Sequence, residues 1–173
     1  MSDTLTKHAS KGSFNKVKMA TLDGLATKKS GGGVVKYLVH GATGKTAAPD
    51  FAPSQLIEAI QAGLPLLELM ELQKSLAVPM KQLVPMLGIS KATLHRRMGG
   101  RRLKPAESAR VVRLARLLGK AVEVMESEET ARQWLTSPQF RLGGAAPLDY
   151  AETEVGAREV EDLLGRIEYG VYS

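Results

Sequence analysis

The stretch MKQLVPMLGISKATLHRR, residues 80–97, has the spacing of a helix-turn-helix. Leu83 and Leu87 lie one helical turn apart, and Gly88 permits the sharp turn that must follow them. Ser90 is a favourable N-cap for a second helix. The pattern therefore predicts two short helices packed against each other, with the polar side of the second helix turned towards a partner.

That polar side is basic. If Leu94 contacts the core, the neighbouring side chains of the second helix face outwards, where Arg and Lys can bind guanine acceptors or phosphates and Thr can contact either. The predicted DNA-binding residues are Ser90, Lys91, Thr93, His95, Arg96, Arg97, Arg101, Arg102 and Lys104. Two residues depart from a good match, because Pro85 falls where the first helix should still form hydrogen bonds and Arg97 occupies a usually apolar position. A helical hairpin with a solvated basic rim is the alternative.

Charge is unevenly distributed along the chain, whose net charge is +6. Residues 91–120 hold 10 Lys/Arg and 1 Asp/Glu, whereas residues 121–173 hold 4 and 11. A basic middle and an acidic end indicate two partners of opposite character, the first of them anionic. A basic stripe on the helix predicted from Pro105 to Met125 could extend the DNA surface, or it could pair with acidic residues of the C-terminal segment or of a partner. It comprises Arg110, Arg113, Arg116 and Lys120.

Apolar residues recur at helical spacing from Pro53 onwards, and no strand is predicted after residue 50, so the expected fold class is all-α. Three regions are predicted: a flexible basic arm over 1–52, a helix-turn-helix region over 53–104, and a helical C-terminal domain over 105–173. Within the arm only VVKYLV, residues 34–39, looks strand-capable. The last helix is expected to begin after its cap Thr153 and to turn a set of apolar residues inwards. These are Val155, Val160, Leu163, Leu164 and Ile167.

The composition argues against several classes of protein. There is no cysteine, no run of about 18 apolar residues and no apolar leader, so a cytoplasmic protein without a membrane partner is expected. The three histidines are scattered, and no metal site, cofactor site or nucleophile–base pair emerges. GATGKT, residues 41–46, ends like a phosphate-binding loop, but Val39 stands where that motif needs glycine. No catalytic residue is predicted, and an enzyme is not expected.

Residues 130–173 are similar to the toxin-binding domain of the Xre/MbcA/ParS family of bacterial antitoxins. The features that match are WL at 134–135, LGG at 142–144, PLD at 147–149 and YGVY at 169–172. Upstream, AIQAGLP, LGISKATLHRR and LKPAESARVVRLARL resemble the Xre-like half of that family. The resemblance covers about residues 55–173.

This resemblance implies an antitoxin of a type II toxin–antitoxin system whose partner is a RES-domain toxin that consumes NAD. It also implies neutralisation by direct contact, repression of its own operon through the helix-turn-helix, and a dimer or a larger toxin–antitoxin complex. The competing hypothesis is a helix-turn-helix transcription regulator whose acidic half only dimerises.

The chain finishes on RIEYGVYS, residues 166–173, with two of its four tyrosines in the last five residues. Tyrosine brings a large, rigid contact area with a polar tip and is enriched in interfaces. The predicted toxin-binding residues are Glu168, Tyr169, Gly170, Val171, Tyr172 and Ser173. We expect this segment to enter or cover the toxin's active site, and the alternative is that Tyr169 and Tyr172 pack back onto the chain's own helices.

Overall fold

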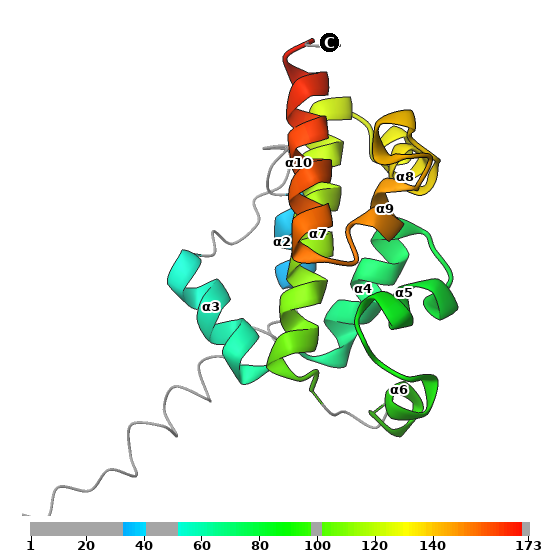
Figure 1. Ribbon diagram of the computed structural model, residues 1–173. Helices are drawn as coiled ribbons and strands as arrows, with labels where there is room; N and C mark the ends of the chain where they lie inside the picture. The colour runs from blue at the N-terminus through cyan, green and yellow to red at the C-terminus, as the bar shows by residue number, and fades with distance from the viewer. Residues whose placement is uncertain (1–32, 41–51, 98–101, 171–173) are drawn as a thin grey trace, which may run out of the picture. The chain divides into compact units, whose positions relative to one another are not determined.

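The computed structural model describes residues 33–40, 52–97 and 102–170, and the regular elements that it assigns there are all helical (Figure 1). In chain order they are α2 (Val34–His40), α3 (Pro53–Ala62), α4 (Leu66–Leu76), α5 (Met80–Met86), α6 (Lys91–Arg97), α7 (Pro105–Met125), α8 (Glu128–Thr136), the 3-10 turn η2 (Phe140–Leu142), α9 (Pro147–Tyr150) and α10 (Glu154–Glu168). The predicted all-α fold class is thus confirmed over the described residues.

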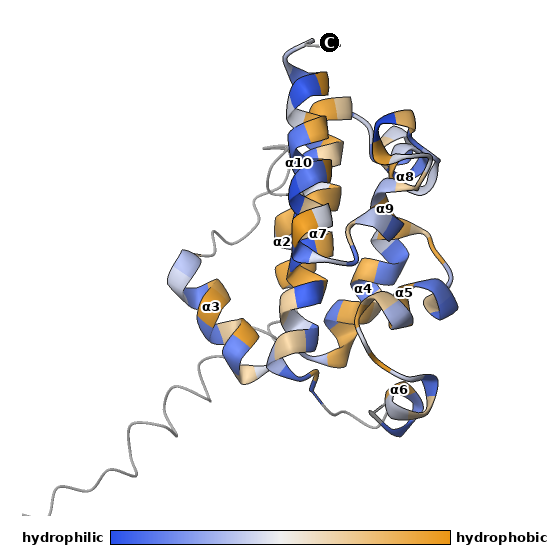
Figure 2. Cartoon of the chain, in the orientation of Figure 1, coloured by the Kyte–Doolittle hydropathy of each residue, from blue (hydrophilic) through white to orange (hydrophobic). Residues whose placement is uncertain are grey.

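Helix α7 is the central element of the described fold. It begins at Pro105, where the side chain of Glu107 accepts a hydrogen bond of 2.7 Å from the Lys104 amide, and it ends at Met125 as the sequence predicts. Helices α2, α3, α4, α8 and α10 all pack against it. Its leucines Leu114, Leu117 and Leu118 are at most 2% exposed, and each such burial contributes about 1.5–3 kcal/mol. In Figure 2 hydrophobic residues, coloured orange, recur along α7 and along the helices beside it.

Helix α10 runs beside α7 and in the same direction (Figure 1). The Thr153 hydroxyl accepts a 3.0 Å hydrogen bond from the Gly156 amide, which confirms the predicted cap. The prediction that Val155 faces inwards is wrong, because its side chain is 72% exposed. The buried stripe of α10 runs from Gly156 to Leu164, and Val155 lies about 140° from its centre at 100° per residue.

Residues 34–39, which look strand-capable in the sequence, belong to helix α2 and are part of the core. Val34, Val35 and Val39 are buried. The backbone of α2 lies so close to α7 that a Cβ atom at Gly119 would collide with the Leu38 carbonyl oxygen. The expectation of a loosely attached arm is therefore wrong for residues 33–40. Tertiary burial outweighs the strand preference of β-branched residues here, while the remainder of the arm lies outside the described residues.

A buried carboxylate anchors the first turn of α2. Glu68 of α4 is 6% exposed, and its two carboxylate oxygens accept hydrogen bonds of 3.2 Å and 2.9 Å from the amides of Val34 and Val35. Burial raises the pKa of Glu68, although the two amide hydrogen bonds act in the opposite direction. A folded-state pKa above the unfolded value means that protonation favours folding. This contribution is present at acidic pH and is lost as pH rises through the folded pKa.

Replacing Glu68 should therefore change both stability and its pH dependence. We expect Glu68→Ala to lower the free energy of unfolding by about 2 kcal/mol, because two amides at a helix start lose their acceptors. At neutral pH, Glu68→Gln should lower the free energy of unfolding by less than Glu68→Ala does. The free energy of unfolding of the wild type minus that of Glu68→Gln should fall from pH 4 to pH 7. Urea unfolding followed by circular dichroism measures both quantities. A constant difference between wild type and Glu68→Gln over this range would contradict the assignment.

Candidate functional site

Helices α5 and α6 form the predicted helix-turn-helix. Leu83 and Leu87 are fully buried, and Gly88 adopts a φ of +64° in the turn between the helices. The Ser90 hydroxyl accepts a 3.1 Å hydrogen bond from the amide of Thr93, as an N-cap does. Leu94 packs partly buried against the core. The sequence pattern thus describes the local geometry of this unit correctly.

Pro85 does not prevent helix α5 from forming. It occupies the last turn of the helix, and its side chain is exposed. The carbonyl that loses its partner belongs to Lys81, which is also exposed, so water can replace the missing hydrogen bond. Pro85 therefore leaves the packed face of α5 intact.

The structure separates the predicted DNA-binding residues into groups. Exposed side chains belong to Ser90, Lys91, His95, Arg96 and Lys104, whereas Thr93 is half-buried. The side chain of Arg97 and all of Arg101 lie outside the described part of the chain. Helix α6 thus presents Lys91, His95 and Arg96 to solvent. Their contact with DNA stays a prediction.

Arg102 has a structural contact. It is half-buried, and its Nε donates a 2.7 Å hydrogen bond to the carbonyl of Gly63, at the end of α3. The backbone also forms an isolated antiparallel bridge between Pro65 and Arg102. The Arg102 guanidinium therefore helps to hold the end of α3 near the start of α7.

The basic stripe of α7 contacts other parts of the chain. Arg110 donates from Nη1 to the Leu87 carbonyl at 2.8 Å, which ties the turn of the helix-turn-helix to α7. A Cβ atom at position 88 would collide with that same guanidinium, a second reason for glycine there. Three residues along α7, Arg113 reaches the start of α10.

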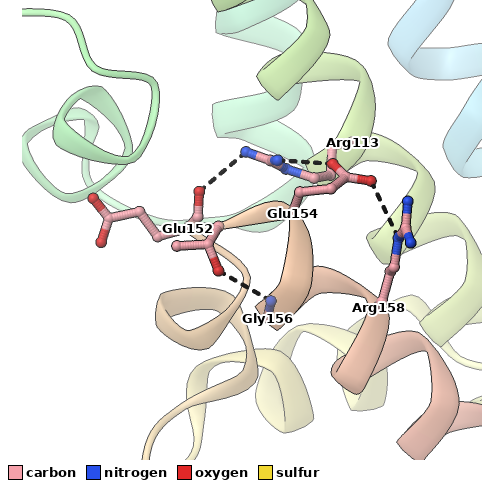
Figure 3. Close-up of polar contacts among 6 residues, drawn as sticks. Arg113, Glu152, Glu154, Gly156 and Arg158 are labelled. Atoms are coloured by element: carbon pink, nitrogen blue, oxygen red, sulfur yellow. Dashed lines mark hydrogen bonds and ion pairs between the residues drawn. The ribbon is translucent and has the colours of Figure 1, made fainter.

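Figure 3 shows how Arg113 contacts the start of α10. Its Nη1 lies 3.0 Å from a carboxylate oxygen of Glu154, and its Nη2 donates at 3.0 Å to the Glu152 carbonyl. Arg158 reaches the other Glu154 oxygen at 3.6 Å. The Arg113 hydrogen bond is the main reason that the pKa of Glu154 lies below its usual value. The contacts position the first turn of α10 relative to the helix-turn-helix.

A second ion pair lies near the end of α10. Lys120 Nζ is 2.7 Å from a carboxylate oxygen of Glu168 and 3.6 Å from one of Glu123. The hydrogen bond that Lys120 donates to Glu168 is the largest cause of the raised pKa of Lys120. Arg113 and Lys120 thus pair with the C-terminal segment. Of the roles that the sequence allows for the stripe, pairing with the C-terminal segment is the one that these two residues adopt.

The described residues that follow this ion pair, Tyr169 and Gly170, are exposed. Tyr169 is 80% exposed, so it does not pack back onto the chain's own helices. Glu168 and Gly170 are also exposed, while Val171, Tyr172 and Ser173 lie outside the described residues. The predicted toxin-binding segment therefore begins at an accessible helix end, and its contact with a toxin stays a prediction.

An apolar groove of about 410 Å³ lies beside this helix end. It is lined by Met125, Trp134, Gln139, Phe140, Arg141, Leu163, Arg166 and Ile167. Phe140 is 95% exposed. The sequence interpretation missed this residue as a candidate for binding. The sequence did contain a sign of an exposed aromatic residue here. Phe140 is a large aromatic that lies in a polar segment between Pro138 and the LGG turn.

The described residues contain no cluster of three or more His, Asp or Glu that could hold a metal ion. Among the helices that the model describes, none is long and apolar enough to cross a bilayer.

Two family models match the chain. Residues 55–116 match the antitoxin Xre-like helix-turn-helix domain, and residues 120–170 match the antitoxin Xre/MbcA/ParS C-terminal toxin-binding domain. The two matched segments meet within α7. The domain boundary predicted between residues 104 and 105 stays a prediction.

The chain is also similar to curated proteins of this kind. It is 32% identical over 120 residues to an "Antitoxin Xre" of Yersinia enterocolitica, covering 68% of this chain and 81% of the relative. A second "Antitoxin Xre", from Photorhabdus laumondii, is 29% identical over 127 residues, covering 72% and 86%. A "Prs ADP-ribosylating antitoxin" of Sphingobium sp. is 26% identical over 132 residues, covering 70% and 83%.

Proposed function

Because the chain belongs to the Xre/MbcA/ParS family of antitoxins, we propose that it neutralises a RES-domain toxin that consumes NAD and that it represses its own operon. The observation that carries the first part is the accessible end of α10, with Tyr169 80% exposed inside the matched toxin-binding segment. The name of the Sphingobium relative refers to ADP-ribosylation, a reaction whose donor is NAD, and this supports a toxin that uses NAD.

Neutralisation would proceed by occlusion of the toxin's active site. An enzyme that uses NAD must hold a pyrophosphate, so its cleft should be positive. Glu161, Asp162 and Glu168 lie on the last turns of α10 and would steer this end of the antitoxin towards such a cleft. Tyr169 and Tyr172 would then occupy space that NAD needs, with the aromatic stacking available to an adenine or nicotinamide ring.

Repression would use the helix-turn-helix. Helix α6 would enter the major groove with Lys91 and Arg96 near bases and phosphates. We propose a dimer on a two-fold operator in the cytoplasm, with half-sites about 34 Å apart. Ile57, Leu67 and Met70 are exposed apolar side chains that support self-association. The chain itself would act by binding, without enzymatic activity.

Co-expression with the adjacent reading frame tests the proposal. The neighbouring protein alone should arrest growth and deplete cellular NAD, and induction of this chain should restore both. The two proteins should also co-purify as a stable complex. If the neighbour is not toxic and does not bind, the chain is instead a regulator whose acidic half only dimerises.

A further inference from the structure

We propose that the groove beside the end of α10 is a second toxin-docking site, which takes an apolar side chain of the toxin flanked by acidic residues. The inference rests on the proposed function, since it assumes that the chain binds a toxin. It adds a site made of other residues than the segment 168–173, and it states the chemistry that the toxin must present there.

The shape and lining of the groove fit a large apolar side chain. Its floor and walls come from four elements: Met125 at the end of α7, Trp134 of α8, Phe140 of η2, and Leu163 and Ile167 of α10. Its volume of about 410 Å³ falls in the range of pockets that enclose ligands. Phe140 stands 95% exposed at this site. An exposed aromatic beside an apolar groove is the arrangement that interface anchors typically adopt.

The charge of the groove differs from that of the domain around it. Residues 121–173 hold 4 Lys/Arg and 11 Asp/Glu, and all four cations are arginines. Two of them, Arg141 and Arg166, line the groove, and Arg166 is exposed. Arginine binds carboxylates through parallel hydrogen bonds, so Arg166 favours an acidic neighbour for the apolar side chain.

Its location favours the toxin as occupant. All lining residues fall within residues 120–170, the segment that matches the toxin-binding model. Met125 lies about 22 Å along α7 from Arg110, the residue that contacts the helix-turn-helix, at 1.5 Å per residue. A protein seated in the groove could therefore leave α6 accessible to DNA. The acidic surroundings disfavour nucleic acid as the occupant.

The single tryptophan of the chain lines this groove and provides a direct reporter. Antitoxin labelled with 5-fluorotryptophan should give one fluorine resonance in NMR spectra. We expect purified toxin to shift it and promoter DNA to leave it in place. Phe140→Ala and Arg166→Glu should each weaken toxin binding about tenfold or more, as interface anchors do. Both side chains are exposed, so helicity and operator binding should persist.

Val155→Ala is the matched control, since Val155 is an exposed apolar residue at the opposite end of α10. It should change toxin affinity less than twofold. Toxin that binds without moving the fluorine resonance, or with unchanged affinity for both groove variants, overturns the groove assignment while the proposed function stands. A resonance that shifts with antitoxin concentration alone identifies a second copy as the occupant and also overturns it. Failure of the wild type to bind toxin refutes the proposed function itself.

Discussion

Removal of residues 168–173 is expected to abolish toxin neutralisation while helicity and operator binding stay unchanged. The truncation deletes the exposed Tyr169 together with Tyr172, and interface tyrosines that anchor a complex each contribute about 2 kcal/mol or more. A loss of at least about 100-fold in toxin affinity should follow. The fold should survive, because the ion pair lost with Glu168 is partly exposed and such pairs contribute at most about 1 kcal/mol.

Growth rescue at equal antitoxin expression, checked by immunoblot, measures this effect in cells, and calorimetry with purified toxin measures it directly. A chain that stops after Gly170 is the matched control for the ion pair, since it keeps both Glu168 and Lys120. We expect this shorter truncation to lose most of the affinity as well, because Tyr172 is missing. Full rescue by the longer truncation would show that the helix surfaces, and not the segment 168–173, block the toxin.

The parts of the fold that depend on local signals could be predicted from the sequence. Pro105 at a first helical position and Thr153 as a cap set the starts of α7 and α10, and the structure confirms both. The turn between α5 and α6 could likewise be predicted from Gly88 and the flanking leucines. In each case the residues that decide the element lie within a few positions of it.

Helix α2 shows why the rest was not predictable. Its seven residues are too few to form a stable helix alone, and three of them are β-branched valines that favour strands. What stabilises the helix is distant in sequence: the Glu68 carboxylate at its first turn and the close approach to Gly119. Neither partner can be recognised without knowing which helices are neighbours.

The same limit applied to the candidate site. Sequence periodicity placed Arg113 and Lys120 on one side of α7, but the choice between DNA and the acidic segment depended on where α10 lies. Its parallel course beside α7 brings Glu154 and Glu168 to these two residues. Arg102 was grouped with the DNA-binding residues by its position in a basic run, whereas its contact with Gly63 depends on the path of α3.

The contact of Arg102 with Gly63 makes the second prediction specific. Lys91→Ala combined with Arg96→Ala should lower operator affinity by about 10- to 100-fold without a loss of stability, since both side chains are exposed on α6. Loss of the phosphate contact should reduce the slope of log affinity against log salt by about 1. Arg102→Ala should instead destabilise the fold by about 1–2 kcal/mol, because it removes a half-buried hydrogen bond to Gly63.

Fluorescence anisotropy with promoter DNA at several salt concentrations, together with urea unfolding of each variant, separates these two effects. Lys74→Ala is the control for a lost surface charge, because Lys74 is exposed on α4 and the variant loses one positive charge outside α6. Its operator affinity should stay within about twofold of the wild type, since a charge outside the interface contributes only a screened, long-range attraction. If the α6 double variant kept wild-type affinity and salt slope, α6 would be a packing unit with a solvated basic rim. The operator contact would then have to come from another surface of the chain.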